Sequence, residues 1–98
     1  MRNIERNVVT AVRNCLNYKS GNTRVEVVNN EGVKNVFVYL FGKLIYKIVN
    51  GDEFFTLAGW NTQTTRNRLH ALGVDVNQKN FAPIYNGVEI DTNAWYKA

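Results

Sequence analysis

Side chains that could do chemistry are densest between Thr62 and His70, where hydroxyl, amide, guanidinium and imidazole groups follow one another. Hydroxyls and amides at the start of a helix bind anions readily, and Arg66 and Arg68 would add charge-assisted donors in the next turn. If the apolar side chains of this segment face the core, helical spacing leaves four polar ones outward. They are Gln63, Arg66, Asn67 and His70. The pattern predicts a helix that contacts nucleic-acid phosphates, with an ordinary capped surface helix as the alternative.

Other arginines could extend this basic surface. Arg2, Arg6 and Arg13 are spaced along one ridge of an amphipathic helix that the apolar pattern predicts over residues 2–18. A phosphate-contacting ridge is one interpretation, and a solvated helix face is the other. Arg68 is expected nearer the flank of its own helix, where an acidic residue of the Asp52-Glu53 pair could bind it.

Groups suited to catalysis or metal binding are scattered. The eight acidic residues fall mostly in predicted turns or on exposed strand faces, and none has metal-ligand spacing with the single histidine, His70. Glycines stand singly at turns, so no phosphate-binding glycine loop is present. Cys15 and His70 could meet in space as nucleophile and base, although a core position on the first helix is the alternative for Cys15. We expect no enzymatic activity, no metal site and no cofactor.

Size and composition predict one small intracellular domain. The 98 residues are 45% apolar, enough for a single core, so residues 1–98 are expected to form one domain. A lone cysteine excludes an internal disulfide and suits a reducing cytoplasm. The longest apolar run, Val36 to Phe41, is far shorter than the ~20 residues of a membrane helix, and no signal peptide precedes it. The net charge of +4 favours polyanionic partners.

The 62–70 segment must be positioned by a strand that passes into a helix. Residues 52–58 are predicted to form a strand with both faces largely buried. Asn61 or Thr62 can cap the following helix, and Gly73 can take the left-handed conformation that ends it. Trp60 is expected to fill the core beneath the helix start, with a base-stacking role as the alternative.

The preceding residues predict an antiparallel meander. Strands are expected at residues 23–29, 33–41, 44–49 and 52–58, joined by tight turns that include Gly42-Lys43 and Asn50-Gly51. Residues 33–41 are apolar on both faces, with Phe37 and Tyr39 on one of them, which is typical of a central strand. Residues 23–29 have the pattern of a half-buried edge strand.

The C-terminal part predicts one more hairpin. Residues 75–79 are interpreted as a polar connection to strands at 81–85 and 88–91, and Pro83 places this hairpin at a sheet edge or apart from the main sheet. The terminal aromatic residues should dock on the body of the domain, although Tyr85 and Trp95 could instead be exposed for stacking or for a protein interface. The predicted fold is α+β: helix, four-stranded antiparallel meander, helix and C-terminal β-hairpin, with both helices on one face of the sheet.

Three segments carry a family resemblance. They are residues 40–45 (Leu-Phe-Gly-Lys-Leu-Ile), residues 57–72 with an Ala-Gly-Trp-x-Thr-x-Thr-Thr-x-x-Arg-Leu block, and residues 78–81 (Gln-Lys-Asn-Phe). Together they resemble a group of small bacteriophage proteins, and the likeness covers residues 36–96. It implies a phage origin, and hence the host cytoplasm as the place of action, but it brings no activity with it.

The sequence therefore predicts a non-enzymatic phage accessory protein. The first hypothesis is binding of DNA or RNA through backbone phosphates, because the chain is basic and its arginines are grouped. The alternative is an inhibitor of a host enzyme or defence complex. Neither hypothesis involves a membrane, and the sequence identifies neither the ligand nor the oligomeric state.

Overall fold

The computed structural model describes residues 3–98, whose helices and strands follow the order helix, five strands, helix and four strands. Their bounds are α1 Asn3–Arg13, β1 Tyr18–Ser20, β2 Thr23–Asn30, β3 Val33–Leu40, β4 Lys43–Val49, β5 Asp52–Phe55, α2 Gln63–Ala71, β6 Val76–Lys79, β7 Ala82–Tyr85, β8 Val88–Glu89 and β9 Tyr96–Lys97.

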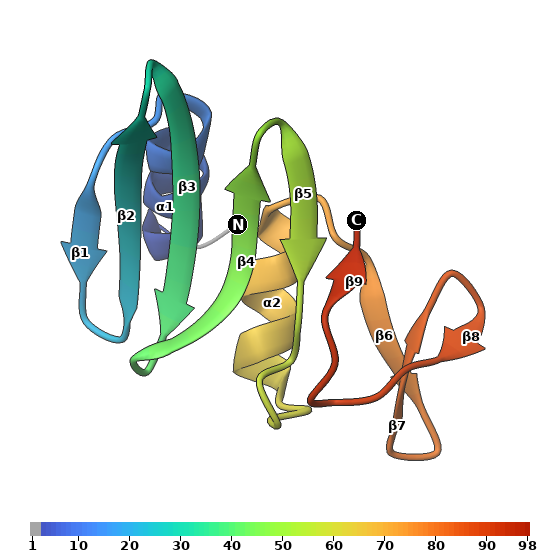
Figure 1. Ribbon diagram of the computed structural model, residues 1–98. Coiled ribbons are helices and arrows are strands. Elements are labelled where there is room, and N and C mark those ends of the chain that lie inside the picture. The colour runs from blue at the N-terminus through green and yellow to red at the C-terminus, as the bar shows by residue number, and fades with distance from the viewer. Residues whose placement is uncertain (1–2) are drawn as a thin grey trace.

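The main sheet is an antiparallel meander that is extended at both edges. Its strand order is β1-β2-β3-β4-β5-β9, so the predicted four-stranded meander β2 to β5 is confirmed (Figure 1). β1 pairs with β2 through Tyr18↔Val25, and β9 pairs with β5 through Phe55↔Tyr96. The prediction that residues 23–29 form an edge strand is wrong, because a three-residue strand too short to be recognised in the sequence lies outside β2.

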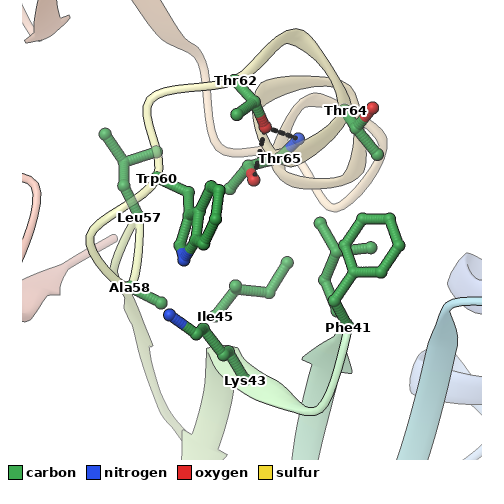
Figure 2. A pocket seen from close by; sticks show the side chains of 10 residues that line it. Phe41, Lys43, Ile45, Leu57, Ala58, Trp60, Thr62, Thr64 and Thr65 are labelled. Atoms are coloured by element: carbon green, nitrogen blue, oxygen red, sulfur yellow. Dashed lines mark hydrogen bonds between the residues drawn. The ribbon is translucent and has the colours of Figure 1, made fainter.

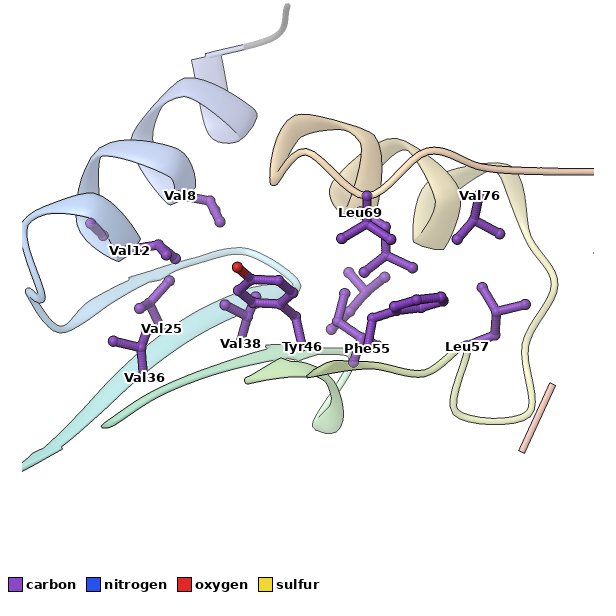
Figure 3. Packing of buried hydrophobic residues seen from close by; sticks show 14 of the residues in the cluster. Val8, Val12, Val25, Val36, Val38, Tyr46, Phe55, Leu57, Leu69 and Val76 are labelled. Atoms are coloured by element: carbon purple, nitrogen blue, oxygen red, sulfur yellow. The ribbon is translucent and has the colours of Figure 1, made fainter. Parts of the chain in front are cut away.

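Both helices cover the same face of this sheet, as predicted. In Figure 1 they lie behind the strands, with α1 behind β2 and β3, and α2 behind β4 and β5. Buried side chains fill the space between helices and strands, among them Val8 from α1, Val38 and Phe55 from the sheet, and Leu69 from α2 (Figure 3). The α+β class is thereby confirmed, and among residues 3–98 no helix covers the opposite face of the sheet.

Two hairpin turns test the turn predictions. Asn50-Gly51 forms the predicted two-residue loop with positive φ at both residues. The loop after β3 is Phe41-Gly42 and not Gly42-Lys43, because Leu40 pairs with Lys43 and the chain reverses one residue earlier. Phe41 consequently takes φ 52°, a conformation that a side chain with a Cβ atom adopts rarely.

The two helices end in the same way. After α2, Gly73 has φ 89°, its N–H donates to the carbonyl of His70, and the N–H of Val74 donates to the carbonyl of Leu69 at 2.8 Å. These bonds confirm the predicted glycine ending. The first helix was predicted to reach residue 18 but ends at Arg13, because Cys15 takes φ 52°. The N–H of Cys15 donates to the carbonyl of Val12, and the N–H of Leu16 donates to the carbonyl of Ala11, which is the same pair of bonds. Cys15 is therefore a half-buried residue beyond the helix, not a core residue on it.

The connection from β5 to α2 is tighter than predicted. The strand stops at Phe55 because the chain turns through Ala58 and Gly59, both with positive φ, and the N–H of Trp60 donates to the carbonyl of Leu57 at 2.9 Å. This turn directs Trp60 outward, where 54% of its surface is exposed, so the prediction that it fills the core is wrong. Thr62 caps α2 as one of the two predicted candidates, accepting a hydrogen bond from the N–H of Thr65.

The C-terminal strands form a second sheet with the order β6-β7-β8. Residues 75–79 are therefore largely strand and not the predicted connection, since β6 pairs with β7 along residues 76–79. The placement of Pro83 apart from the main sheet is confirmed. Tyr96 docks as predicted: its ring centroid lies 5.8 Å from that of Phe55, and its hydroxyl accepts from the N–H of Asp91. Trp95 is exposed, in agreement with the alternative.

Candidate nucleic-acid interface

The polar residues of α2 mostly bond to the protein itself. Arg66 is only 6% exposed, and its guanidinium donates to the side-chain oxygens of Asn61 and Gln63. Gln63 in turn donates to Asn67 at 2.7 Å. The prediction that Arg66 points outward is wrong, because the loop before the helix folds back and supplies the acceptor. Gln63 is exposed and Asn67 is half-buried, but they surround a guanidinium that is already satisfied.

Arg68 joins three elements of the fold. It is 3% exposed, and its Nε donates to the hydroxyl of Thr23 at 3.1 Å while Nη1 lies 3.4 Å from Glu5 Oε1. The partner is thus Glu5 of α1 and neither Asp52 nor Glu53, because the side chain extends toward the first helix. Arg68 and Glu5 form a buried ion pair that ties α1, β2 and α2 together.

The other predicted binding residues lie apart from this pair. Arg6 and Arg13 are exposed on α1, as a ridge requires, and Arg2 lies outside the described residues. His70 is exposed near the C-terminal end of α2. Its Nε2 is hydrogen-bonded to the carbonyl oxygen of Val76 and lies 3.6 Å from Oδ1 of Asp75. The structure therefore does not assemble the predicted residues into one exposed basic face.

A different set of aromatic and basic side chains gathers on the open face of the main sheet. Directly paired residues of neighbouring strands lie on one side of a sheet, so the register places these side chains together, opposite the helices. We define the open face by eight residues. They are Phe37, Tyr39, Phe54 and Trp95 with Lys19, Arg24, Lys47 and Lys97.

Cations on the open face lie against its rings. The guanidinium carbon of Arg24 is 4.2 Å from the centroid of Tyr39, and the ammonium of Lys47 is 4.4 Å from that of Trp95 and 5.8 Å from that of Phe54. Each is close enough for a cation–π interaction. The aromatic rings therefore lie beside positive charge while remaining partly accessible: three are half-buried and Trp95 is exposed.

The charge of the open face is positive. Its four cations share the surface with Glu26, 3.7 Å from Arg24, and Asp52, 3.4 Å from Lys97. Both contacts join solvent-exposed groups, and such pairs contribute little free energy. A phosphate could replace either carboxylate without the cost of breaking a buried pair.

Sequence reasoning missed this face, although it grouped Phe37 with Tyr39 and considered Trp95 for stacking. The alternation that puts Phe37 and Tyr39 together was recognised, but the apolar residues on both faces of β3 were interpreted only as the mark of a central strand. Alternation separates the two sides of a strand without saying what covers each side. The available signal was the aromatic pair Phe37 and Tyr39 on one side of β3, opposite the aliphatic Val36, Val38 and Leu40 on the other.

A cleft lies between the helices on the covered face. It is lined by Tyr46, Glu53, His70 and Cys15 among others, so the two members of the hypothetical Cys–His pair share it. The hydroxyl of Tyr46 donates to the carboxylate of Glu53. Burial, followed by this hydrogen bond and the carboxylate charge, raises the pKa of Tyr46 far above its usual value. The hydroxyl therefore stays protonated and acts as a structural donor.

Among residues 3–98, no group of three histidine, cysteine or acidic side chains could hold a metal ion. Within the same range, no helix is long and apolar enough to cross a membrane.

Comparison with known proteins gives a family but no activity. No curated protein and no solved structure matches the chain. The family model described as Kyanoviridae Gp96 protein matches residues 1–98, in agreement with the phage origin that the sequence implied. The chain therefore belongs to the Kyanoviridae Gp96 family of bacteriophage proteins.

Proposed function

We propose that this protein is a non-enzymatic phage accessory protein that binds single-stranded DNA or RNA on the open face of its main sheet. The observation that carries the proposal is the placement of Arg24 and Lys47 against the rings of Tyr39, Phe54 and Trp95. Bases would stack on the rings, and the cations beside them would neutralise backbone phosphates.

A single strand fits this surface better than a duplex. Ring faces can stack only on bases that are not already stacked within a double helix, and aromatic side chains on a sheet are a recurring platform for such bases. Duplex readout instead inserts a helix or a β-ribbon into a groove. Here the helix first expected to contact phosphates, α2, has its two arginines buried and hydrogen-bonded within the protein.

The test is a binding titration with a labelled single strand of about 12 nucleotides, within the site sizes typical of small binding domains. Trp95→Ala should weaken binding by about 1–3 kcal/mol, roughly a 5- to 150-fold loss of affinity, because one base loses its stacking partner. Phe81→Ala is the matched control, since Phe81 is a 91% exposed aromatic in the turn between β6 and β7 of the second sheet and is not one of the open-face residues.

Two outcomes of this titration would contradict the proposal. Equal losses in Trp95→Ala and Phe81→Ala would contradict the assignment of the site, and no binding by the wild type at low salt would end the proposal. DNA and RNA versions of the same strand, with an unlabelled duplex as competitor, show which nucleic acid binds better.

The second candidate function is binding of a host enzyme or defence complex. It is favoured by Phe81, which is almost fully exposed and has φ 67°, where glycine or asparagine is usual. An aromatic side chain held outward at a strained turn is typical of a protein contact. Recovery of a discrete partner from nuclease-treated host lysate, lost in Phe81→Ala, would favour this function.

A further inference from the structure

We infer that the pocket between Phe41 and Trp60 holds one unstacked base of the strand that binds the open face. The inference rests on the proposed function and adds a second binding element to it. The pocket has a volume of ≈ 280 Å³ and lies between the β3–β4 turn and the start of α2 (Figure 2). Its lining is mainly apolar and consists of Leu40, Phe41, Lys43, Ile45, Leu57, Ala58, Trp60, Thr62, Thr64 and Thr65.

Two exposed aromatic side chains stand at this pocket. Phe41 is 71% exposed and Trp60 is 54% exposed, and both project from turns that contain non-glycine residues with positive φ. Figure 2 shows the two rings on either side of the space, with Ile45 between them. Large rings held in solvent by unfavourable turn conformations would gain by covering their faces with a ligand.

The charge at the pocket favours an anionic ligand. Lys43 is the one charged residue in the lining, and its ammonium lies 4.8 Å from the centroid of Trp60. A base beside Trp60 would bring the phosphate of its own nucleotide within reach of this lysine. Such a contact combines stacking with phosphate neutralisation, as on the open face.

The pocket and a second cleft, which reaches the open face, lie on either side of Phe41. The second cleft, of ≈ 340 Å³, shares Phe41 and is lined also by Lys19, Arg24 and Tyr39. These last three belong to the open face, and neither lining contains an acidic residue. A strand stacked on Tyr39 could therefore pass over the β3–β4 turn without meeting a carboxylate in either hollow.

Size and polarity suit one base and not a whole cofactor. The volume is just below the ~300–1,000 Å³ of typical small-molecule pockets. The hydroxyls of Thr62 and Thr65 bond to each other at 2.9 Å, so they are engaged within the protein. Recognition would then depend on shape and stacking, and different bases should be accepted.

Two single-tryptophan proteins separate this inference from the proposed function. The chain contains only Trp60 and Trp95, so Trp95→Phe leaves Trp60 to report on the pocket, and Trp60→Phe leaves Trp95 to report on the open face. Both substitutions keep an aromatic ring. Titration with the single strand of about 12 nucleotides should quench both tryptophans with the same midpoint. If only Trp95 responds, the pocket inference fails and the proposed function stands; if neither responds, both fail.

A strand with one abasic position tests base insertion directly. When the abasic position is scanned along the strand, one location should lower wild-type affinity about 5-fold or more, because the pocket is left empty. Trp60→Ala should abolish that difference, while Phe81→Ala, with an exposed ring outside the pocket, should preserve it. An abasic profile that is identical in wild type and Trp60→Ala would overturn the inference and leave this edge to a protein partner.

Discussion

Helix α2 and the open face of the sheet hold their cations in opposite ways. Behind the sheet, Arg66 and Arg68 are buried and each bonds to side-chain oxygens of the protein. On the open face, Arg24 and Lys47 lie against aromatic rings that water can still reach. Buried cations need fixed partners to offset their lost hydration, whereas cations at the surface can exchange partners at little cost.

This difference separates structural cations from candidate binding cations. Grouping arginines by position in the sequence cannot make the separation, because the type of residue is the same. A matched pair of substitutions can make this separation. Methionine in place of Arg68 or of Lys47 removes a charge but keeps a long side chain in both cases. The first should lower stability, and the second should lower nucleic-acid affinity.

The largest expected effect is that of Arg68→Met. Removing the guanidinium leaves the Glu5 carboxylate, itself buried, without this partner, and breaking one side of a buried ion pair costs about 3–5 kcal/mol. We expect the free energy of unfolding, measured with urea, to fall by that amount.

The double variant Glu5→Gln with Arg68→Met is the control. It should recover part of the loss, since the buried carboxylate that loses its contact with Arg68 is also replaced by a neutral group. A loss below about 1 kcal/mol in Arg68→Met alone would mean that the pair is solvated, and the contrast between the two layers would then fail.

The helix ends show how far the sequence could predict the fold. Gly73 was recognised because glycine adopts positive φ freely, and the Leu69–Val74 hydrogen bond was found as that ending requires. Cys15 makes the equivalent turn without a glycine, so the first helix was predicted several residues too long. Local sequence identifies a turn when the residue there adopts positive φ freely, as glycine does. It misses a turn in which another residue takes positive φ.

The candidate site was less predictable than the fold, for a related reason. Helical spacing placed Arg66 on the outer side of α2, but its exposure is determined by Asn61, which folds back from the loop before the helix. In the same way, alternation grouped Phe37 with Tyr39, but their accessibility depends on the packing of both helices against the other face of the sheet. Exposure is a property of the assembled layers, and the sequence pattern alone gives only the grouping.

A smaller effect concerns Tyr46, a polar group on the covered face. Burial raises its pKa in the folded protein above the value near 10 of an unfolded chain. Above about pH 10 the unfolded chain loses this proton while the folded protein retains it, so unfolding becomes more favourable as pH rises. Tyr46→Phe should lower stability by about 1 kcal/mol at neutral pH and reduce the decline in melting temperature above pH 10.

Glu53→Gln distinguishes the causes of this shift. Burial is the largest contribution and the bond to Glu53 the second, so Glu53→Gln should keep most of the alkaline decline. If the decline disappears in Glu53→Gln, the carboxylate and not burial controls the proton on Tyr46.

The smallest expected effect is on the salt dependence of binding, and it tests the open face most directly. If Lys47 neutralises one phosphate of a single strand, its removal should make the slope of log affinity against log salt shallower by about 0.7. Lys47→Met keeps an unbranched side chain against Phe54 and Trp95, so stability should change by less than about 1 kcal/mol. Arg6→Met, which removes an exposed arginine from α1 on the other side of the sheet, should leave the slope unchanged. A shallower slope in Arg6→Met but not in Lys47→Met would move the phosphate contacts to the helix ridge first expected from the sequence. Equal slopes in all three proteins would instead show that neither cation meets a phosphate, and would leave stacking alone to account for any binding.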